Sequence, residues 1–278
     1  MIYPKIEGMV HKMLTNLHTH TEFCDGKSTA EEMVLSAVDK GFSSLGFSAH
    51  GYTDFDPSYC MNDTAGYISE VLRLREKYKD KIEIYLGLEE DAGCLQQRCD
   101  FDYIIGSSHY VTRGGVYLHV DSSPEWLEKC VEFFGGDANA MAESYYSNFV
   151  TYIMKRKPDI IGHFDLLTKF EEKATDRFLK NHEYHKIAEK YIREALRADC
   201  MFEVNTGAIS RGWRTAPYPH ENLLRIIREE GGRITLTSDC HHADNLDCFF
   251  AEARKMLRDM GFEYLYALYH GEWVKDYL

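Results

Sequence analysis

Short apolar runs alternate with segments of helical periodicity from one end of the chain to the other. No Pro-, Ser- or Gly-rich linker interrupts this alternation. The seven apolar runs are residues 13–18, 43–50, 82–91, 102–110, 159–166, 201–207 and 233–242. The pattern predicts repeated β–α units around a mostly parallel sheet.

The first run is followed by the clearest helix signal. We expect this helix to open at Ser28, with Glu31 as its capping-box partner and Gly41 as its C′ residue. A hairpin is predicted through residues 114–121, and the tail from Phe262 onward is either a last strand or a packed segment. Two helical stretches follow the hairpin, and further helices are predicted at residues 64–79, 181–199, 219–230 and 244–259.

Composition supports a globular α/β protein. Apolar residues make up 44% of the 278 residues and aromatic residues 13%, which is enough to bury a sizeable core. Length alone permits one barrel or two small domains. Because no linker divides the chain, we expect a single domain over residues 1–278.

Charge and cysteine usage narrow the classes of partner. The formal net charge of −13 argues against wrapping of nucleic acid, which needs a Lys/Arg surface. Nothing approaches the roughly 20 apolar residues of a membrane span. The eight cysteines are scattered without a CxxC pair, and Lys5 and Glu7 interrupt any signal peptide. We therefore expect a reduced cytoplasmic protein, a monomer or a homodimer.

The apolar runs carry His, Asp and Glu residues at or near their ends. His18 and His20 are one residue apart, and on a strand that spacing points both imidazoles to the same side. The other ligand-type residues near run ends are Asp25, His50, Glu89, His109, His163, Asp239 and His241. In parallel barrels the strand C-termini meet at one face, so these nine residues are expected to converge.

Mixed imidazole and carboxylate ligands suit Zn²⁺, Mn²⁺ or Fe²⁺. Nine ligands exceed what one ion takes, whereas two or three ions sharing a bridging carboxylate would use them. That arrangement stabilises both the attacking and the leaving oxygen in a phosphoryl displacement. We read five other histidines as structural or solvated: His11, His182, His185, His220 and His270.

Together these motifs give the chain a family resemblance. HTH at 18–20, SAHG at 48–51, GLEED at 87–91, GSSHY at 106–110, GHFDL at 162–166, EVNTGAISRG at 203–212 and TSDCHH at 237–242 stand in one order along nearly the whole chain. In this the chain resembles the polymerase and histidinol phosphatase (PHP) family. The resemblance implies a distorted, seven-stranded TIM-like (β/α)7 barrel with a trinuclear metal centre at the C-terminal face of its strands.

The resemblance also implies how the ligands are shared. His18, His20, Glu89 and Asp239 would hold one ion, and Glu89 would bridge to an ion bound by His109 and His163. A third ion would be held by Asp25, His50 and His241, with Glu22 as a near alternative to Asp25. The implied activity is hydrolysis of L-histidinol phosphate by a metal-bound hydroxide, with Glu89, Asp239 and Asp165 as catalytic residues.

The sequence determines the residues that contact the substrate less closely than it determines the metal ligands. A positive side chain in NTGAISRGWRTAPYP, residues 205–219, is expected near the phosphate, and either Arg211 or Arg214 would fit. Asp165 would orient an imidazole or donate a proton. Tyr52 and Tyr110 are candidates to contact the substrate, because loop aromatics can stack on an imidazole ring.

Several neighbours and functions stay open. Glu90 and Asp91 are either supports of the site or solvent-exposed, His242 is expected to pack, and Cys24 and Cys240 are read as free buried thiols. The alternative activities are hydrolysis of another small phosphate ester or a nucleotide, or metal binding without catalysis. Oxidoreductase chemistry is disfavoured because no GxGxxG follows a strand.

Overall fold

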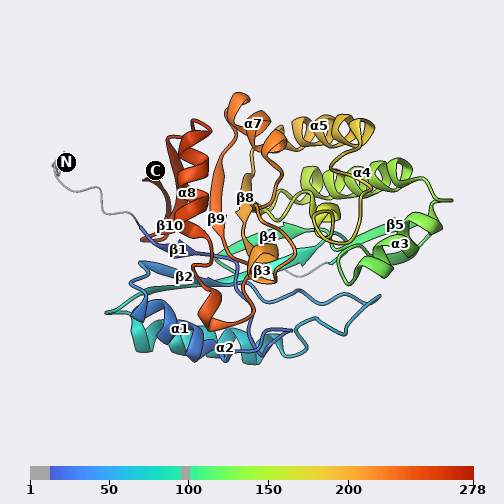
Figure 1. Cartoon of the computed structure of the whole chain (residues 1–278). Helices are drawn as coiled ribbons and strands as arrows, with labels where there is room; N and C mark the ends of the chain where they lie inside the picture. Colours follow the sequence, from blue (N-terminus) through green and yellow to red (C-terminus); the bar gives the residue numbers. More distant parts are fainter. Residues whose placement is uncertain (1–12, 95–100) are drawn as a thin grey trace.

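A parallel sheet of seven strands forms the centre of the molecule (Figure 1). The computed structural model describes residues 13–94 and 101–278. The strands, in their order across the sheet, are β1 (Thr15–Asn16), β2 (Ser44–Phe47), β3 (Glu83–Asp91), β4 (Tyr103–Ser107), β7 (Ile160–Ile161), β8 (Met201–Asn205) and β9 (Ile234–Thr237). Each of the seven predicted runs contains one of these strands, so the predicted parallel sheet is confirmed.

The two edges of this sheet curl toward each other. Thr19, just after β1, forms a parallel bridge with Cys240, just after β9. The amide of His20 donates to the carbonyl of Cys240 at 2.9 Å. The sheet is therefore a nearly closed barrel, joined beside the C-terminal ends of its first and last strands.

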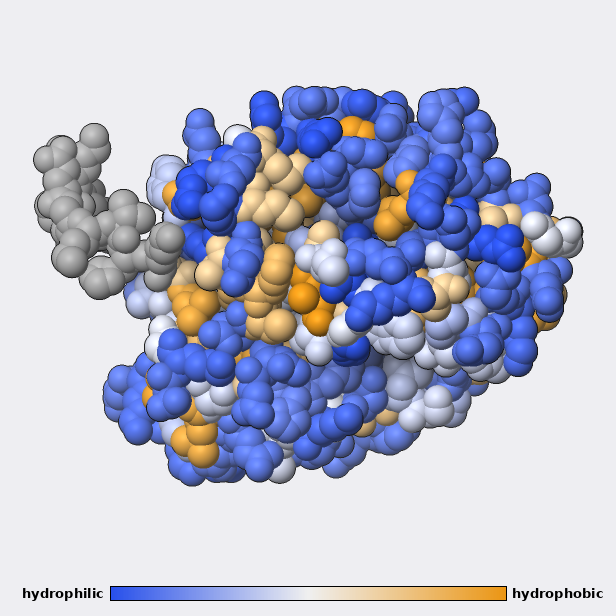
Figure 2. Space-filling view, in the orientation of Figure 1, coloured by the Kyte–Doolittle hydropathy of each residue, from blue (hydrophilic) through white to orange (hydrophobic). Residues whose placement is uncertain are grey.

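Helices pack around the outside of this barrel. In Figure 1, α1 and α2 lie along the bottom of the view, and α8, α7, α5 and α4 lie across its top. Their outward faces are mostly hydrophilic (Figure 2). The helices are α1 (Ala30–Asp39), α2 (Thr64–Tyr78), α3 (Pro124–Phe133), α4 (Ala138–Arg156), α5 (His182–Leu196), α6 (Gly207–Ser210), α7 (Glu221–Glu229) and α8 (Phe250–Asp259). None of the described helices is long and apolar enough to cross a bilayer.

The first helix begins one residue later than its sequence predicts. Thr29 is the N-cap and Glu32 completes the capping box, instead of Ser28 and Glu31. The hydroxyl of Ser28 instead accepts the backbone N–H of Ala243 at 3.1 Å, a contact between segments far apart in sequence. Gly41 follows the C-cap with φ +77°, as expected of a C′ residue.

The last predicted helix is also shorter than its periodicity indicates. Residues 243–245 form a 3₁₀ turn, and α8 begins only at Phe250, after Phe249 adopts a left-handed conformation. The other local predictions agree better with the structure. β5 (Tyr110–Arg113) and β6 (Val116–His119) form the expected hairpin.

The tail forms a second hairpin, β10 (Tyr264–Tyr269) and β11 (Glu272–Tyr277), that covers one end of the barrel. The hydroxyl of Ser44, at the start of β2, donates to the carbonyl of Leu268 at 2.9 Å. Glu83, at the start of β3, accepts the backbone N–H of His270 at 2.7 Å. The hairpin therefore closes the N-terminal end of the strands and leaves the C-terminal end open.

The side chain of Tyr103 fills the barrel interior. Its hydroxyl lies 3.0 Å from the carbonyl oxygen of Phe47 and also meets the carbonyl of Leu17. A Cβ at Gly46 would lie 2.3 Å from this hydroxyl, and a Cβ at Gly87 only 2.2 Å from the ring. Glycine at both positions is what lets a tyrosine occupy the interior.

We expect Gly87→Ala to destabilise the fold by about 1–3 kcal/mol, because its methyl group overlaps the buried Tyr103 ring. Urea unfolding followed by circular dichroism measures the change. The matched comparison is the same substitution in a Tyr103→Leu background, where the smaller side chain relieves the overlap. An equal cost of Gly87→Ala in both backgrounds would contradict this explanation.

Candidate metal centre

All nine predicted ligands meet at the C-terminal end of the barrel. His18 and His20 follow β1, His50 follows β2, and Glu89 lies in β3. Three of the four remaining strands add ligands in the same way, with His109 after β4, His163 after β7, and Asp239 and His241 after β9. The loop after β1 contributes Asp25. Parallel strands of a barrel end at one face, which explains how residues more than 200 positions apart converge.

The carboxylate of Glu89 lies at the centre of this cluster. Its Oε2 is 3.1 Å from Nε2 of His18, 3.3 Å from Nε2 of His20 and 3.0 Å from Nδ1 of His50. Its Oε1 is 3.1 Å from Nε2 of His163 and 3.6 Å from Nε2 of His109. The two oxygens therefore face different imidazoles, as a bridging carboxylate requires.

Asp239 adds a second carboxylate beside the first pair of histidines. Its Oδ1 is 3.3 Å from Nε2 of His20 and 3.7 Å from Nε2 of His18. Its backbone is left-handed, with φ +45°, a conformation that a residue other than glycine rarely adopts and that is enriched at functional sites. This turn directs the carboxylate toward the histidines.

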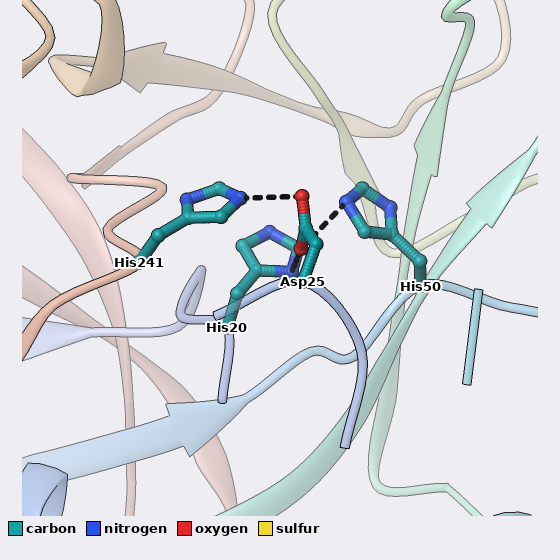
Figure 3. Close-up of side chains that lie close together, drawn as sticks. All are labelled: His20, Asp25, His50 and His241. Atoms are coloured by element: carbon teal, nitrogen blue, oxygen red, sulfur yellow. Dashed lines mark hydrogen bonds and ion pairs between the residues drawn. The ribbon is translucent and has the colours of Figure 1, made fainter. Parts of the chain in front are cut away.

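Asp25 organises a further group at the cluster's edge (Figure 3). His241 and His50 flank its carboxylate, with Nε2 atoms 3.2 Å and 3.6 Å from the nearest oxygens. The ring of His20 stacks on both flanking rings, with centroids 4.3 Å apart. The alternative ligand Glu22 instead accepts the N–H of Ala30 at 3.4 Å, at the start of α1.

Unpartnered ligand atoms show that this donor set fits a divalent cation. Among the described buried side chains, Nε2 of His18, Nε2 of His20 and Oε2 of Glu89 have no hydrogen-bond partner, yet they face one another. Donor atoms that each lie about 2.0–2.2 Å from a shared ion are about 3.0–3.5 Å apart, as found here. Mixed imidazole and carboxylate donors suit Zn²⁺, Mn²⁺ or Fe²⁺.

The electrostatics of the cluster favour positive charge at its centre. Burial opposes a charged ring at His18, but Glu203, Glu89 and Asp239 outweigh it and raise the pKa of His18 to about 10. Burial likewise opposes the Glu89 carboxylate, but the surrounding histidines hold its pKa well below the usual range. The carboxylates favour positive charge at this position, and a divalent cation would supply it.

Two buried carboxylates fix the orientation of the ligand rings. Glu203 in β8 accepts Nδ1–H of His18 at 2.5 Å and the backbone N–H of His163 at 2.7 Å. Asp91 accepts Nδ1–H of His109 at 2.8 Å. Its neighbour Glu90 faces away from the cluster and pairs with Arg156 at 2.7 Å. Asp91 therefore supports the site, whereas Glu90 is buried in an ion pair outside it and is not solvent-exposed.

The sequence reasoning missed Glu203, although it stands in the quoted EVNTGAISRG motif. β8 was the one predicted strand to which no ligand was assigned. A carboxylate inside an apolar strand run is the signal that would have identified it, because buried carboxylates need partners.

A cavity of ≈390 Å³ opens over the cluster. Arg211 lines it, with Nη2 at 3.0 Å from Oδ2 of Asp239 and Nη1 at 3.2 Å from Nδ1 of His241. The cavity also has lining residues that the sequence did not single out: Ser58, Tyr59, His119, Asp121, Ser122, Leu166 and Lys169.

Four predicted site residues lie outside both the ligand cluster and this lining. Arg214 is buried, bonds Thr168 and stacks over the ring of Tyr218, whose centroid is 4.4 Å away. Asp165 is buried and accepts the backbone N–H of His220 at 2.9 Å. Tyr110 packs against a neighbouring imidazole, that of His119, and Tyr52 is exposed on its loop. Of the two arginines, the structure places Arg211 at the cavity.

The remaining predictions concern residues near the ligands. Cys240 is buried, and Cys24 is half-buried with its sulfur 3.4 Å from Nδ1 of His20; both are free thiols. His242 does not pack in the core but caps the 3₁₀ turn at 243–245 by accepting the N–H of Asp244. The prediction for His11 lies outside the described residues.

Comparisons with known proteins identify the family of this chain. The family model of the PHP domain matches residues 16–207. A probable histidinol-phosphatase of Schizosaccharomyces pombe is 27% identical over 88% of this chain and 86% of its own length. A probable histidinol-phosphatase of Deinococcus radiodurans is also 27% identical, over 89% of this chain and 94% of its own.

Two solved structures share the fold. A putative histidinol phosphatase from Listeria monocytogenes superposes with a TM-score of 0.74 at 22% identity, over 86% of this chain and 99% of its own. The histidinol phosphate phosphatase of Lactococcus lactis, solved with zinc, L-histidinol and phosphate, superposes with a TM-score of 0.71 at 23% identity. The match covers 94% of this chain and 98% of the other. With a family model that matches more than half of its length, this chain belongs to the PHP domain family.

Proposed function

We propose that this chain is a metal-dependent phosphatase that hydrolyses L-histidinol phosphate to L-histidinol and phosphate. The observation that carries the proposal is the convergence of eight ligand-type residues around Glu89, beneath a cavity of ≈390 Å³. A cavity of this size suits a small molecule. The relatives that align over most of this chain are named as histidinol-phosphatases, which supports the choice of substrate.

The ligand assignment follows the two oxygens of Glu89. His18, His20, Asp239 and Oε2 of Glu89 would hold one ion, and Oε1 would share a second ion with His109 and His163. Asp25, His50 and His241 would hold a third. Bound Zn²⁺, Mn²⁺ or Fe²⁺ ions would supply Lewis acidity to the phosphate and lower the pKa of water.

The protein's own groups bind and orient the substrate. Arg211 lies at the cavity with its guanidinium held by Asp239, so its remaining N–H groups are positioned for phosphate oxygens. The buried Glu203 and Asp91 hold the imidazoles of His18 and His109 in fixed orientations. Asp165 does not line the cavity, so it has no role in the proposed mechanism.

The wider setting is also inferred. Cys24, Cys60, Cys130, Cys240 and Cys248 are free thiols, which supports a reducing, cytoplasmic location. We infer a single domain over residues 1–278 and a small-molecule substrate in place of nucleic acid. Whether the protein is a monomer or a homodimer stays a prediction.

We expect His18→Ala to lower the bound metal per chain and to reduce kcat/KM for L-histidinol phosphate by at least about 100-fold, since it removes a ligand of the central ion. Elemental analysis and phosphate release measure the two effects. The matched control is His182→Ala, an exposed histidine on α5. Full metal content and activity in His18→Ala would rule out the proposed site.

The substrate is tested separately on the native protein. We expect phosphate release from L-histidinol phosphate to exceed release from a panel of sugar phosphates and nucleotides. The reason is that relatives aligned over most of this chain are named as probable histidinol-phosphatases. Equal, slow rates across the panel would overturn the assignment of L-histidinol phosphate as the substrate. They would remain consistent with a general phosphatase activity.

We expect Glu203→Gln to weaken metal binding by about 10- to 100-fold, because the buried amide is neutral and orients His18 less firmly. Competition with a chromogenic chelator measures the affinity. Glu143→Gln is the control, since Glu143 pairs with Lys190 at the surface. An unchanged affinity in Glu203→Gln would show that this carboxylate does not support the metal site.

A further inference from the structure

The cavity has a second wall that takes no part in the metal cluster. We define this recognition wall by Tyr59, His119, Asp121, Ser122 and Lys169. They come from the loop after β2, the end of β6 with the segment that follows it, and the segment after β7. A substrate whose phosphate lies at the metal cluster would place its alcohol portion against this wall.

Asp121 is fixed firmly in the recognition wall. The ammonium of Lys169 donates to both its carbonyl oxygen, at 2.7 Å, and its Oδ2, at 3.0 Å. The residue before it, Val120, donates its backbone N–H to the carbonyl of His109 at 3.0 Å. Asp121 is therefore held beside a residue of the metal cluster, with 19% of its side chain exposed.

The charge of Asp121 shows which part of a substrate it suits. Among the described residues that line the cavity, the carboxylates are Asp25, Asp239 and Asp121, and only Asp121 lies outside the proposed ligand set. A phosphate dianion is repelled by a carboxylate, so the phosphate belongs with Arg211 and the metal cluster. Asp121 instead suits a cationic hydrogen-bond donor.

Asp121 keeps unused hydrogen-bonding capacity. A carboxylate has about four acceptor sites, and Lys169 occupies one of them through Oδ2. The contact with Lys169 orients the carboxylate, while its exposed side remains available to a ligand in the cavity.

We propose that Asp121 is a specificity-determining residue that accepts a hydrogen bond from the ammonium group of an amino alcohol phosphate. This rests on the proposed function and deepens it. In L-histidinol phosphate the amine is on the carbon next to the one that bears the ester oxygen. The amine therefore lies close to the reacting phosphate. Asp121 in turn lies close to His109, one of the predicted metal ligands. Phosphate esters without a neighbouring cation lack this contact.

The test compares two esters that differ only in the amine, L-histidinol phosphate and 3-(imidazol-4-yl)propyl phosphate, with the metal-loaded full chain. Asp121→Asn should lower kcat/KM for L-histidinol phosphate roughly 10- to 100-fold, the size expected for loss of a charged hydrogen bond. The same variant should leave kcat/KM for the ester without an amine within about threefold. Asp247→Asn is the control, because Asp247 also pairs with a lysine, Lys40 at 2.6 Å, outside the cavity.

The outcomes separate this inference from the proposed function. Equal losses on both esters would mean that Asp121 only positions Lys169, and no loss on either would mean that it has no role; both results overturn the inference and leave the phosphatase intact. Failure of the native protein to hydrolyse L-histidinol phosphate would overturn the proposed function, and this inference with it.

A measurement on the native protein covers the case in which Asp121→Asn fails to fold. L-Histidinol and 3-(imidazol-4-yl)propan-1-ol are compared as inhibitors of p-nitrophenyl phosphate hydrolysis. The amine-bearing alcohol should bind about tenfold more tightly, because it alone meets the carboxylate. Equal inhibition by the two alcohols would overturn the inference.

Discussion

The buried carboxylate of Glu89 is the group on which the rest of the site depends. A carboxylate removed from water costs several kcal/mol unless opposite charge or hydrogen-bond donors surround it. Here five imidazoles from four other strand ends approach its two oxygens at 3.0–3.6 Å. This geometry requires the strand ends to be placed accurately, so the barrel and the cluster constrain each other.

The barrel meets this requirement by separating its two ends. The β10–β11 hairpin covers the N-terminal end of the strands, and Tyr103 fills the interior against Gly46 and Gly87. The C-terminal end is left for the polar cluster, in agreement with the general division of parallel barrels into a stabilising face and a functional face. Packing in the interior holds the strands that carry the ligands, and the ligands need no rigid helix of their own.

Segments outside the barrel add a second layer to the site. The loop after β2 is fastened to the β5–β6 hairpin by the stacked rings of Phe55 and Tyr117, with centroids 3.9 Å apart. A hydrogen bond between Asp56 and His119 joins the same two segments. Together they position Tyr59 and Asp121 opposite the metal cluster. In the proposed function, the strand ends supply the metal ligands, and these connecting segments form the wall that faces the alcohol portion of a substrate.

The sequence by itself determined the seven strands and the nine ligand-type residues, because both depend on local patterns. Alternation of apolar runs with helical segments predicts a mostly parallel sheet, and the family resemblance implies that this sheet closes into a barrel whose strand ends converge. The HxH spacing at residues 18–20 determined that two imidazoles share one side. These features need only neighbours within a few positions of the chain.

Only the tertiary structure decided the contacts made between distant segments. The hydroxyl of Ser28 binds the backbone N–H of Ala243, more than 200 residues away, and does not cap the first helix. The N-cap is instead the next residue, Thr29. Arg211 and Arg214 stand three residues apart with the same chemistry, yet one reaches the cavity and the other is buried against Tyr218. The partners of Glu203 and Asp121, which are His18 and Lys169, were identified only in the folded structure. Each of these roles is set by a partner that folding brings near, and local sequence does not encode that partner.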